Sequence, residues 1–404
     1  MLKTIIIKEL LENIKSSKFI IILLACFFLM GFSNFEMYKH YRDNLQSNGF
    51  KPLVNNQYYL QKQPNVISIY VSGTQEIIER TFVYITSNSI VEELSNGMNL
   101  NFYRQLFPIL DFAYVVKVIL SFIAMIVGFD LICGEKNKGT LKLMLSNSIS
   151  RNTVISGKLI GNLLVIVLPF VISSLVFYII INLMPEVYFS YIDNLRLLLL
   201  FIISLFYIAL FFFISVFISI KSNSSQTSIT SCFLVWLTLV FFVPNIGSII
   251  SKIRIQLPSE TLVEEKKVDN RRNILFDNIN KSDEWKTTEV YKKEQEIIFD
   301  FRNKIHKQIS INNAISIFFP AGAFTAFAAN IGNCGFNDED KFRNSLLRFI
   351  EDNRNKKIVQ PFFYKEINLI TSFSNSIGDI ICIMFYCIVF YLLIHFSFLK
   401  HDVR

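Results

Sequence analysis

The sequence is poor in charge and lacks the short motifs that mark several common enzyme classes. Only 18% of its 404 residues are charged, whereas soluble domains carry about a quarter. It contains no Gly-x-x-x-x-Gly-Lys-Ser/Thr loop that could cradle ATP phosphates. It also has no His-Glu-x-x-His helix and no Gly-x-Ser-x-Gly elbow. We therefore expect no catalytic residues, no bound metal and no cofactor.

Cysteine is scarce and poorly placed for disulfides. Of the six cysteines, all but Cys334 lie in or beside apolar runs, which excludes the disulfide framework of a soluble domain. The net charge of +8 does not indicate nucleic-acid binding, because much of the basic excess flanks the apolar runs. The first 18 residues form a long stretch that contains several charged side chains, and no small-residue cleavage site follows residues 19–32. We therefore expect no cleavable signal peptide.

Hydrophobic residues, in contrast, make up 52% of the chain and gather in long runs. Runs of about 18 or more apolar residues are typical of membrane-spanning helices. We predict an all-α polytopic membrane protein with six transmembrane helices. The spans are expected at residues 19–34, 109–133, 159–183, 197–220, 228–250 and 376–399. Residues 311–331 compete for a seventh span, but Pro320 at their middle favours a segment at the membrane surface or buried in the outer domain.

The basic residues orient these spans. Four loops or termini are rich in Lys and Arg, and all four fall on one face if both termini are cytoplasmic. The residues are Lys3, Lys8, Lys15, Lys18, Lys136, Lys138, Lys142, Arg151, Lys158, Lys221, Lys400 and Arg404. The positive-inside rule therefore predicts a multi-pass protein of the cytoplasmic (inner) membrane with both termini in the cytoplasm.

Two long segments, residues 35–108 and 251–375, are then extracytoplasmic. The first contains a strand-like stretch, Val66–Val71, and the second has a helical period. We expect the two segments to pack into one mixed α+β extracytoplasmic domain. At the opposite face, residues 1–18 have an apolar stripe typical of an amphipathic helix that lies in the cytoplasmic interface. The stripe consists of Leu2, Ile6, Leu10 and Ile14, with Ile7 and Leu11.

The most informative stretch joins the second and third spans. It reads Asp130-Leu-Ile-Cys-Gly134-Glu135-Lys136-Asn-Lys-Gly139-Thr140-Leu141-Lys142-Leu-Met144-Leu, and Ser150-Arg151 and Ser156-Gly157-Lys158 follow. This stretch closely resembles ABC-2-type transporter permeases, in the subgroup with large extracytoplasmic insertions after the first and fifth spans. In that subgroup the pattern Asp-x-x-x-Gly-Glu-(Lys/Arg)-x-x-Gly-Thr-Leu-(Lys/Arg)-Leu leaves the second span, and Ser-Arg and Gly-Lys lead into the third.

The resemblance implies a non-catalytic membrane subunit of an ATP-driven exporter. Its partners would be a cytoplasmic ABC ATPase, a second permease chain in a homo- or heterodimer, and membrane lipid. Residues 134–158 would form a cytoplasmic coupling loop that the ATPase pushes. The coupling residues that the resemblance implies are Asp130, Gly134, Glu135, Lys136, Gly139, Thr140, Leu141, Met144, Arg151, Gly157 and Lys158.

The physical properties of the loop agree with a docking element. Gly134 and Gly139 permit a sharp turn where the helix leaves the membrane. Thr140 is suited to the N-cap of a short helix over residues 141–145, which places Leu141 and Met144 on one side. Such a helix can dock in a groove of another protein. A solvated positive-inside loop would explain the lysines equally well, but not the Gly-Glu-x-x-x-Gly-Thr-Leu spacing.

Charged residues within spans are functional candidates. Lys117 and Asp111 lie in the outer part of span two, and Asp379 lies near the outer end of span six. Lys117 could reach outward to the interface, or it could meet Asp379. Asp130, at the inner end of span two, could pair with Lys136 or Lys158.

A membrane receptor or scaffold, whose extracytoplasmic domain binds a ligand or a partner protein, is the alternative function. Six spans exceed what anchoring requires, and no cytoplasmic signalling domain is visible in the sequence. These two features favour the exporter subunit, whose outer domain could also transmit force to an envelope partner.

Overall fold

The computed structural model describes residues 2–47, 57–60, 64–73, 81–85, 89–93, 110–146, 150–277, 281–335 and 364–400, with short pieces between 337 and 349. Among these residues, six helices or helix series are long and apolar enough to cross a membrane, the number predicted from the sequence. They are α2 (Ser17–Ser47), α4–η2–α5 (Phe112–Gly128, continuing to Asn137), α8 (Arg151–Asn182), α9 (Tyr191–Lys221), α10–η3–α11 (Ser225–Arg254) and α16 (Leu369–Lys400). The chain is therefore a helical, multi-pass membrane protein.

Serine residues begin three of these helices. The side chains of Ser150, Ser190 and Ser224 accept hydrogen bonds from backbone N–H groups in the first turns of α8, α9 and α10. Each bond satisfies a donor that has no partner within its own helix. The short connection from Lys221 to Ser225 therefore turns the chain sharply between α9 and α10.

Two of the helix series contain π-helical turns. η2 (Val115–Leu120) separates α4 (Phe112–Tyr114) from α5 (Ser121–Gly128), and η3 (Thr238–Phe242) separates α10 (Ser225–Leu237) from α11 (Val243–Arg254). Pro244 lies two residues after the end of η3 and has no N–H to donate to an i−4 carbonyl. This missing donor favours the irregular turn before it.

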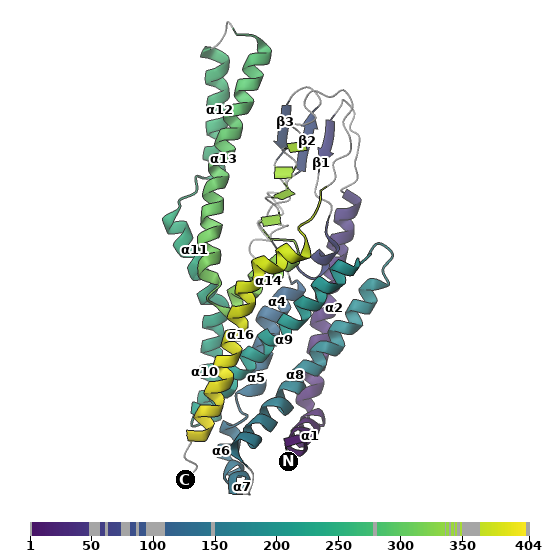
Figure 1. Ribbon diagram of the computed structural model, residues 1–404, viewed down its shortest axis with the longest axis vertical. Coiled ribbons are helices and arrows are strands. Elements are labelled where there is room, and N and C mark those ends of the chain that lie inside the picture. The colour runs from purple at the N-terminus through teal and green to yellow at the C-terminus, as the bar shows by residue number, and fades with distance from the viewer. Residues whose placement is uncertain are drawn as a thin grey trace.

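The molecule is elongated, with different elements at its two ends (Figure 1). Both termini lie at one end, which we call the terminal end, together with α1 (Leu2–Ile14), α6 (Cys133–Asn137) and α7 (Thr140–Ser146). The opposite end, the hairpin end, carries a small sheet and a long helical hairpin made of α12 (Glu260–Asp277) and α13 (Asp283–Ser316).

The sheet is antiparallel, with the order β1 (Gln57–Leu60), β2 (Thr81–Ile85), β3 (Ser89–Glu93). Tyr59 pairs with Val83, which pairs in turn with Val91. The predicted strand over Val66–Val71 is wrong, because this stretch forms a 3-10 helix, η1 (Val66–Ile69). The Asn65 side chain caps η1, and Ile67 and Ile69 are both buried. The consecutive apolar residues are therefore buried by packing of η1 on α2 and α9, without a sheet.

The expectation of one mixed α+β domain is not supported. The α12–α13 hairpin stands apart from the sheet (Figure 1), and it is joined to the bundle through α11. The two long segments do meet close to the helices. Cys334 Sγ donates to the carbonyl of Val71, and Gly73 has a φ of +56° and lies against the Cys334 backbone. A side chain at position 73 would collide with that backbone, so glycine permits this contact.

The stretch 311–331 is not one helix. α13 ends at Ser316, and α14 (Pro320–Ile331) begins at the proline, which is favoured in a first helical turn. With 12 residues α14 is about 18 Å long, too short to cross a bilayer core. It is buried against α16 and α9, where Phe324 stacks on Tyr207 with ring centroids 4.6 Å apart.

Candidate functional site

The loop between α5 and α8 is built of two short helices at the terminal end. α6 and α7 follow each other directly, and Gly139 turns the chain between them with a φ of +73°. This value lies in the left-handed region that glycine adopts without strain. No other atom lies within 4 Å of the position where a Gly139 side chain would begin. The predicted sharp turn is therefore at Gly139, and its cause is backbone conformation.

Gly134 has a different role from the one predicted. It lies inside α6 and is buried, and a Cβ there would lie 2.6 Å from both carboxylate oxygens of Asp130. Ser225 Oγ, at the start of α10, donates to Asp130 Oδ1 at 2.5 Å. The expected pairing of Asp130 with Lys136 or Lys158 is wrong, because Asp130 instead joins the loop to α10. Its short side chain lies against Gly134.

The first residue of α7 closes the turn. Thr140, the predicted N-cap, is instead the first residue of the helix, and its hydroxyl donates to the Glu135 carbonyl at 3.3 Å. Lys136 Nζ reaches Asn223 Oδ1, in the connection between α9 and α10, at 3.4 Å. The loop is thus held against the neighbouring connection by polar contacts at its surface.

The two sides of α7 differ in what they contact. Leu141 is 2% exposed and belongs to the hydrophobic core, and Met144 packs against the same core. Leu143, which was not among the predicted coupling residues, is 70% exposed beside the exposed Lys142. Leu141 and Met144 therefore hold α7 to its own chain, and Lys142 and Leu143 form its outward face.

Lys158 lies at the centre of a buried ionic cluster. Its side chain is 0% exposed, and its ammonium group contacts Glu9 Oε1 at 2.7 Å and Glu135 Oε1 at 2.5 Å. Asn162 Nδ2 donates to the second oxygen of Glu9 at 3.1 Å, and Asn13 Nδ2 donates to Asn162 Oδ1 at 3.0 Å. The cluster joins three elements, α1, α6 and α8, through one cation.

Two glycines of α8 bring α1 close enough for this cluster. A Cβ on Gly157 would lie 2.7 Å from Ile5 Cγ2, and one on Gly161 would lie 2.7 Å from Glu9 Cβ. Ile5, Glu9 and Asn13 lie four residues apart on one face of α1. Glu9 is the functional candidate that sequence reasoning missed. Its spacing from Ile5 and Asn13 is the signal that could have found it.

The outer edge of α1 remains apolar and exposed. Leu2, Ile7 and Leu11 are all exposed. Arg151, at the start of α8, donates to the carbonyl of Leu399 near the end of α16, at 3.2 Å. The beginning of α8 therefore contacts α1 on one side and the last turn of α16 on another.

The three intramembrane candidates are not brought together. Asp111 is buried and accepts hydrogen bonds from Tyr114 N at 2.7 Å and from Ser72 N at 2.9 Å, so it caps α4 and holds the η1 segment. Lys117 lies within η2, and no hydrogen bond or ion pair in the described chain joins its ammonium group to Asp379. The proposed Lys117–Asp379 contact is therefore absent from the described residues. Asp379 is buried in α16.

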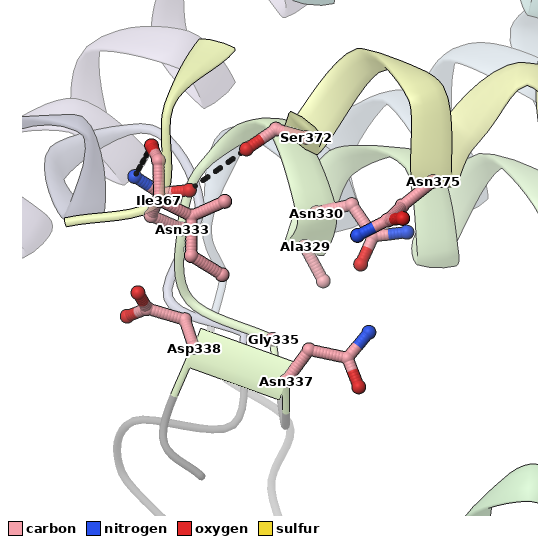
Figure 2. Close-up of a pocket in the computed structure, with 9 residues that line it drawn as sticks. All are labelled: Ala329, Asn330, Asn333, Gly335, Asn337, Asp338, Ile367, Ser372 and Asn375. Carbon is pink, nitrogen blue, oxygen red and sulfur yellow. Dashed lines mark hydrogen bonds between the residues drawn. The ribbon is translucent and has the colours of Figure 1, made fainter. Parts of the chain in front are cut away.

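A second polar cluster, absent from the sequence expectations, lies at the junction of α9, α14 and α16. Arg196 is buried and donates to the carbonyls of Ile331 at 2.8 Å and Ile367 at 2.6 Å. Asn333, with a φ of +51°, donates to the same Ile367 carbonyl and accepts from Ser372 Oγ (Figure 2). These contacts tie the end of α14 to the start of α16.

A small pocket opens beside this junction. Its polar lining includes Asn330, Asn337, Asn375, Asp338 and Ser372 (Figure 2). Nearby, burial raises the pKa of the Glu366 carboxyl, and the negative charges of Asp338 and Asp193 raise it further. The hydrogen bond from Asn333 and the charge of Arg196 oppose this rise in pKa. Among the described residues, no group of three His, Cys, Asp or Glu side chains could hold a metal ion.

The fold and this loop define a class of protein, namely a multi-pass helical membrane protein with a braced, two-helix loop beside its termini. The sequence of the whole chain identifies the family within that class. The chain belongs to the ABC-2 family transporter proteins, whose family model matches residues 3–403. This membership confirms the resemblance seen between Asp130 and Lys158, and it makes the chain a component of a membrane transporter. No match is found among the curated proteins.

Proposed function

We propose that the chain is the membrane-spanning permease subunit of an ABC-2-type ATP-driven exporter. The ATPase would be a separate cytoplasmic chain, and a second permease chain would complete the transporter. Family membership supports the transporter role, and the basic residues at the terminal end support a cytoplasmic position for that end. We further propose the cytoplasmic membrane of the cell as its location.

The observation that carries the proposal is the rigid attachment of the α6–α7 loop. Lys158 joins the loop to α8 through Glu135 and to α1 through Glu9. Asp130 and Ser225 join the loop to α10. A force applied to α7 from outside would therefore reach α1, α8 and α10 through these contacts.

The outward face of α7 supplies the contact for the ATPase. Lys142 and Leu143 are exposed and make no contribution to the core of their own chain, whereas a large exposed apolar side chain beside a cation suits a protein groove. Closure of the ATPase on ATP would push this face, and the braced loop would tilt α5 and α8.

The test uses Leu143→Arg in the complex of the chain with its copurifying ABC ATPase. We expect ATPase activity that no longer responds to the permease, a loss of about tenfold or more in stimulation, which corresponds to about 1.4 kcal/mol or more of lost coupling. Expression and thermal stability should stay unchanged, because Leu143 is 70% exposed.

Leu262→Arg is the matched control, because Leu262 is also an exposed leucine but lies on α12 at the hairpin end. It should leave stimulation intact. Full stimulation by the Leu143→Arg chain would show that α7 is not the docking element.

A further inference from the structure

Asp379 is a buried acid for which the described chain offers no partner. Its side chain is 3% exposed, and it lies ten residues into α16, about 15 Å along the helix from Leu369. No hydrogen bond or ion pair of the described residues involves its carboxylate. The short aspartate stem cannot carry the charge to the interface as a lysine side chain can. An isolated carboxylate in this position is costly unless a cation or a proton neutralises it.

The elements packed on α16 cannot supply that cation. α14 contains no Lys, Arg or His. In α9 the basic residues are Arg196, whose Nη1 and Nη2 donate to the Ile331 and Ile367 carbonyls, and Lys221 at the far end of the helix. In α8 they are Arg151 and Lys158, which are both engaged at the terminal end. A cation that pairs with Asp379 would therefore have to come from outside the described chain.

A polar face of α16 leads to Asp379 from the pocket beside Asn333. Ser372, Ser376 and Asp379 are all buried, at positions i, i+4 and i+7 of one helix face. Ser372 also lines the pocket, together with Asn375 (Figure 2). The next position of the face is Ile383, which is buried and apolar, so the polar face ends at Asp379.

The ligand class follows from these groups. Hydroxyl, carboxamide and carboxylate oxygens bind hard cations. One carboxylate balances a single positive charge, whereas a divalent ion generally takes more acidic ligands than this face offers. The neighbouring helix α14 is rich in small buried residues, among them Ala321, Ala323 and Ala328, and it packs closely on α16, which restricts the ligand to a small group.

We propose that Asp379 and Ser376 form a binding site for a small monovalent cation, either an alkali ion or an ammonium group, which enters past Ser372 and Asn375. The site is independent of the ATPase, so it does not rest on the coupling role of the α6–α7 loop. A cation bound there would hold α16 against α14 and the junction around Asn333.

The experiment measures thermal unfolding of the full chain in detergent at pH 8 and constant ionic strength. The salts are sodium, potassium or ammonium chloride, compared with the chloride of N-methylglucamine, whose cation is too large to enter. A ligand that binds only the folded state raises Tm. We expect at least one small cation to raise Tm by about 2 °C or more. The Asp379→Asn variant should lose this response, and Asp300→Asn, at an exposed acid of α13, should keep it.

Equal Tm values in all four salts, or the same response in Asp379→Asn, would overturn the proposal. A second measurement on the unchanged chain covers a failure of Asp379→Asn to fold. Dicyclohexylcarbodiimide modifies carboxyl groups in apolar surroundings, and mass spectrometry of the α16 peptide reports the modification of Asp379. We expect the small cations to slow this modification several-fold relative to N-methylglucamine, and an unchanged rate would contradict a cation site.

Discussion

At the scale of single residues, we expect the replacement of Lys158 to change the stability of the fold most. Breaking a buried ion pair by removing one partner costs about 3–5 kcal/mol, because the other charge is left uncompensated. Lys158→Met would leave Glu9 and Glu135 facing each other without a cation. We therefore predict a strong loss of thermal stability for Lys158→Met, measured as the fall in Tm of the detergent-solubilised chain.

The triple variant Lys158→Met/Glu9→Gln/Glu135→Gln is the control, because it removes the two stranded charges as well. It should recover much of the lost Tm, since neutral side chains of similar shape do not need a buried counter-charge. If the single and the triple variant unfold at the same temperature, the ionic cluster does not stabilise the fold through charge.

The same loop shows how far the sequence predicts single residues. The sequence indicated the importance of Gly134 and Gly139, but only Gly139 has the left-handed backbone that its residue type suggested. At Gly134 a Cβ would collide with the Asp130 carboxylate, and the residue type alone does not distinguish this close side-chain contact from a turn. Glu9 was missed because its partner Lys158 is 149 residues away in the sequence, so that only its spacing from Ile5 and Asn13 pointed to it.

At the scale of elements, the docking of α1 on α8 depends on Gly161. Alanine at this position adds a Cβ that would lie 2.7 Å from Glu9 Cβ and 3.3 Å from the carbonyl of Ile6. Overpacking of this kind costs about 1–3 kcal/mol. We predict that Gly161→Ala loosens α1, so that trypsin cleaves after Lys8 and Lys15 faster than in the unchanged chain.

Gly335→Ala adds the same methyl group where the nearest atoms are 3.5 Å away, an ordinary contact distance. Its cleavage rate within α1 should match that of the unchanged chain. An equal rate in Gly161→Ala would mean that the close approach of α1 to α8 does not hold the helix in place.

Long elements were predictable, and short ones were not. The six apolar runs predicted six helices that could cross a membrane, because in lipid the backbone must satisfy its own hydrogen bonds. The stretch from Val66 to Val71 was mistaken for a strand, since a short apolar run has no periodicity that separates strand from buried helix. The π-helical turns η2 and η3 have no sequence signature beyond Pro244.

At the scale of the whole molecule, the charge distribution and the shape give the same orientation. The terminal end carries α1, α6 and α7 (Figure 1), and with them most of the lysines that lie in short loops. The hairpin end carries α12 and α13, in which acidic and basic residues are both frequent. By the positive-inside rule we predict that the terminal end faces the cytoplasm, and long translocated segments, as we expect the hairpin to be, are exempt from the rule.

The final prediction tests this orientation in intact cells. Single cysteines are introduced as Lys142→Cys on α7 and Phe276→Cys on α12, both at exposed positions, in a background where the six native cysteines are replaced. A membrane-impermeant maleimide added outside should label position 276 and leave position 142 unlabelled until the membrane is permeabilised. The reagent cannot cross the lipid bilayer that the apolar helices between the two ends span. Labelling of position 142 from outside, with protection of position 276, would reverse the orientation and place the α6–α7 loop beyond the reach of a cytoplasmic ATPase.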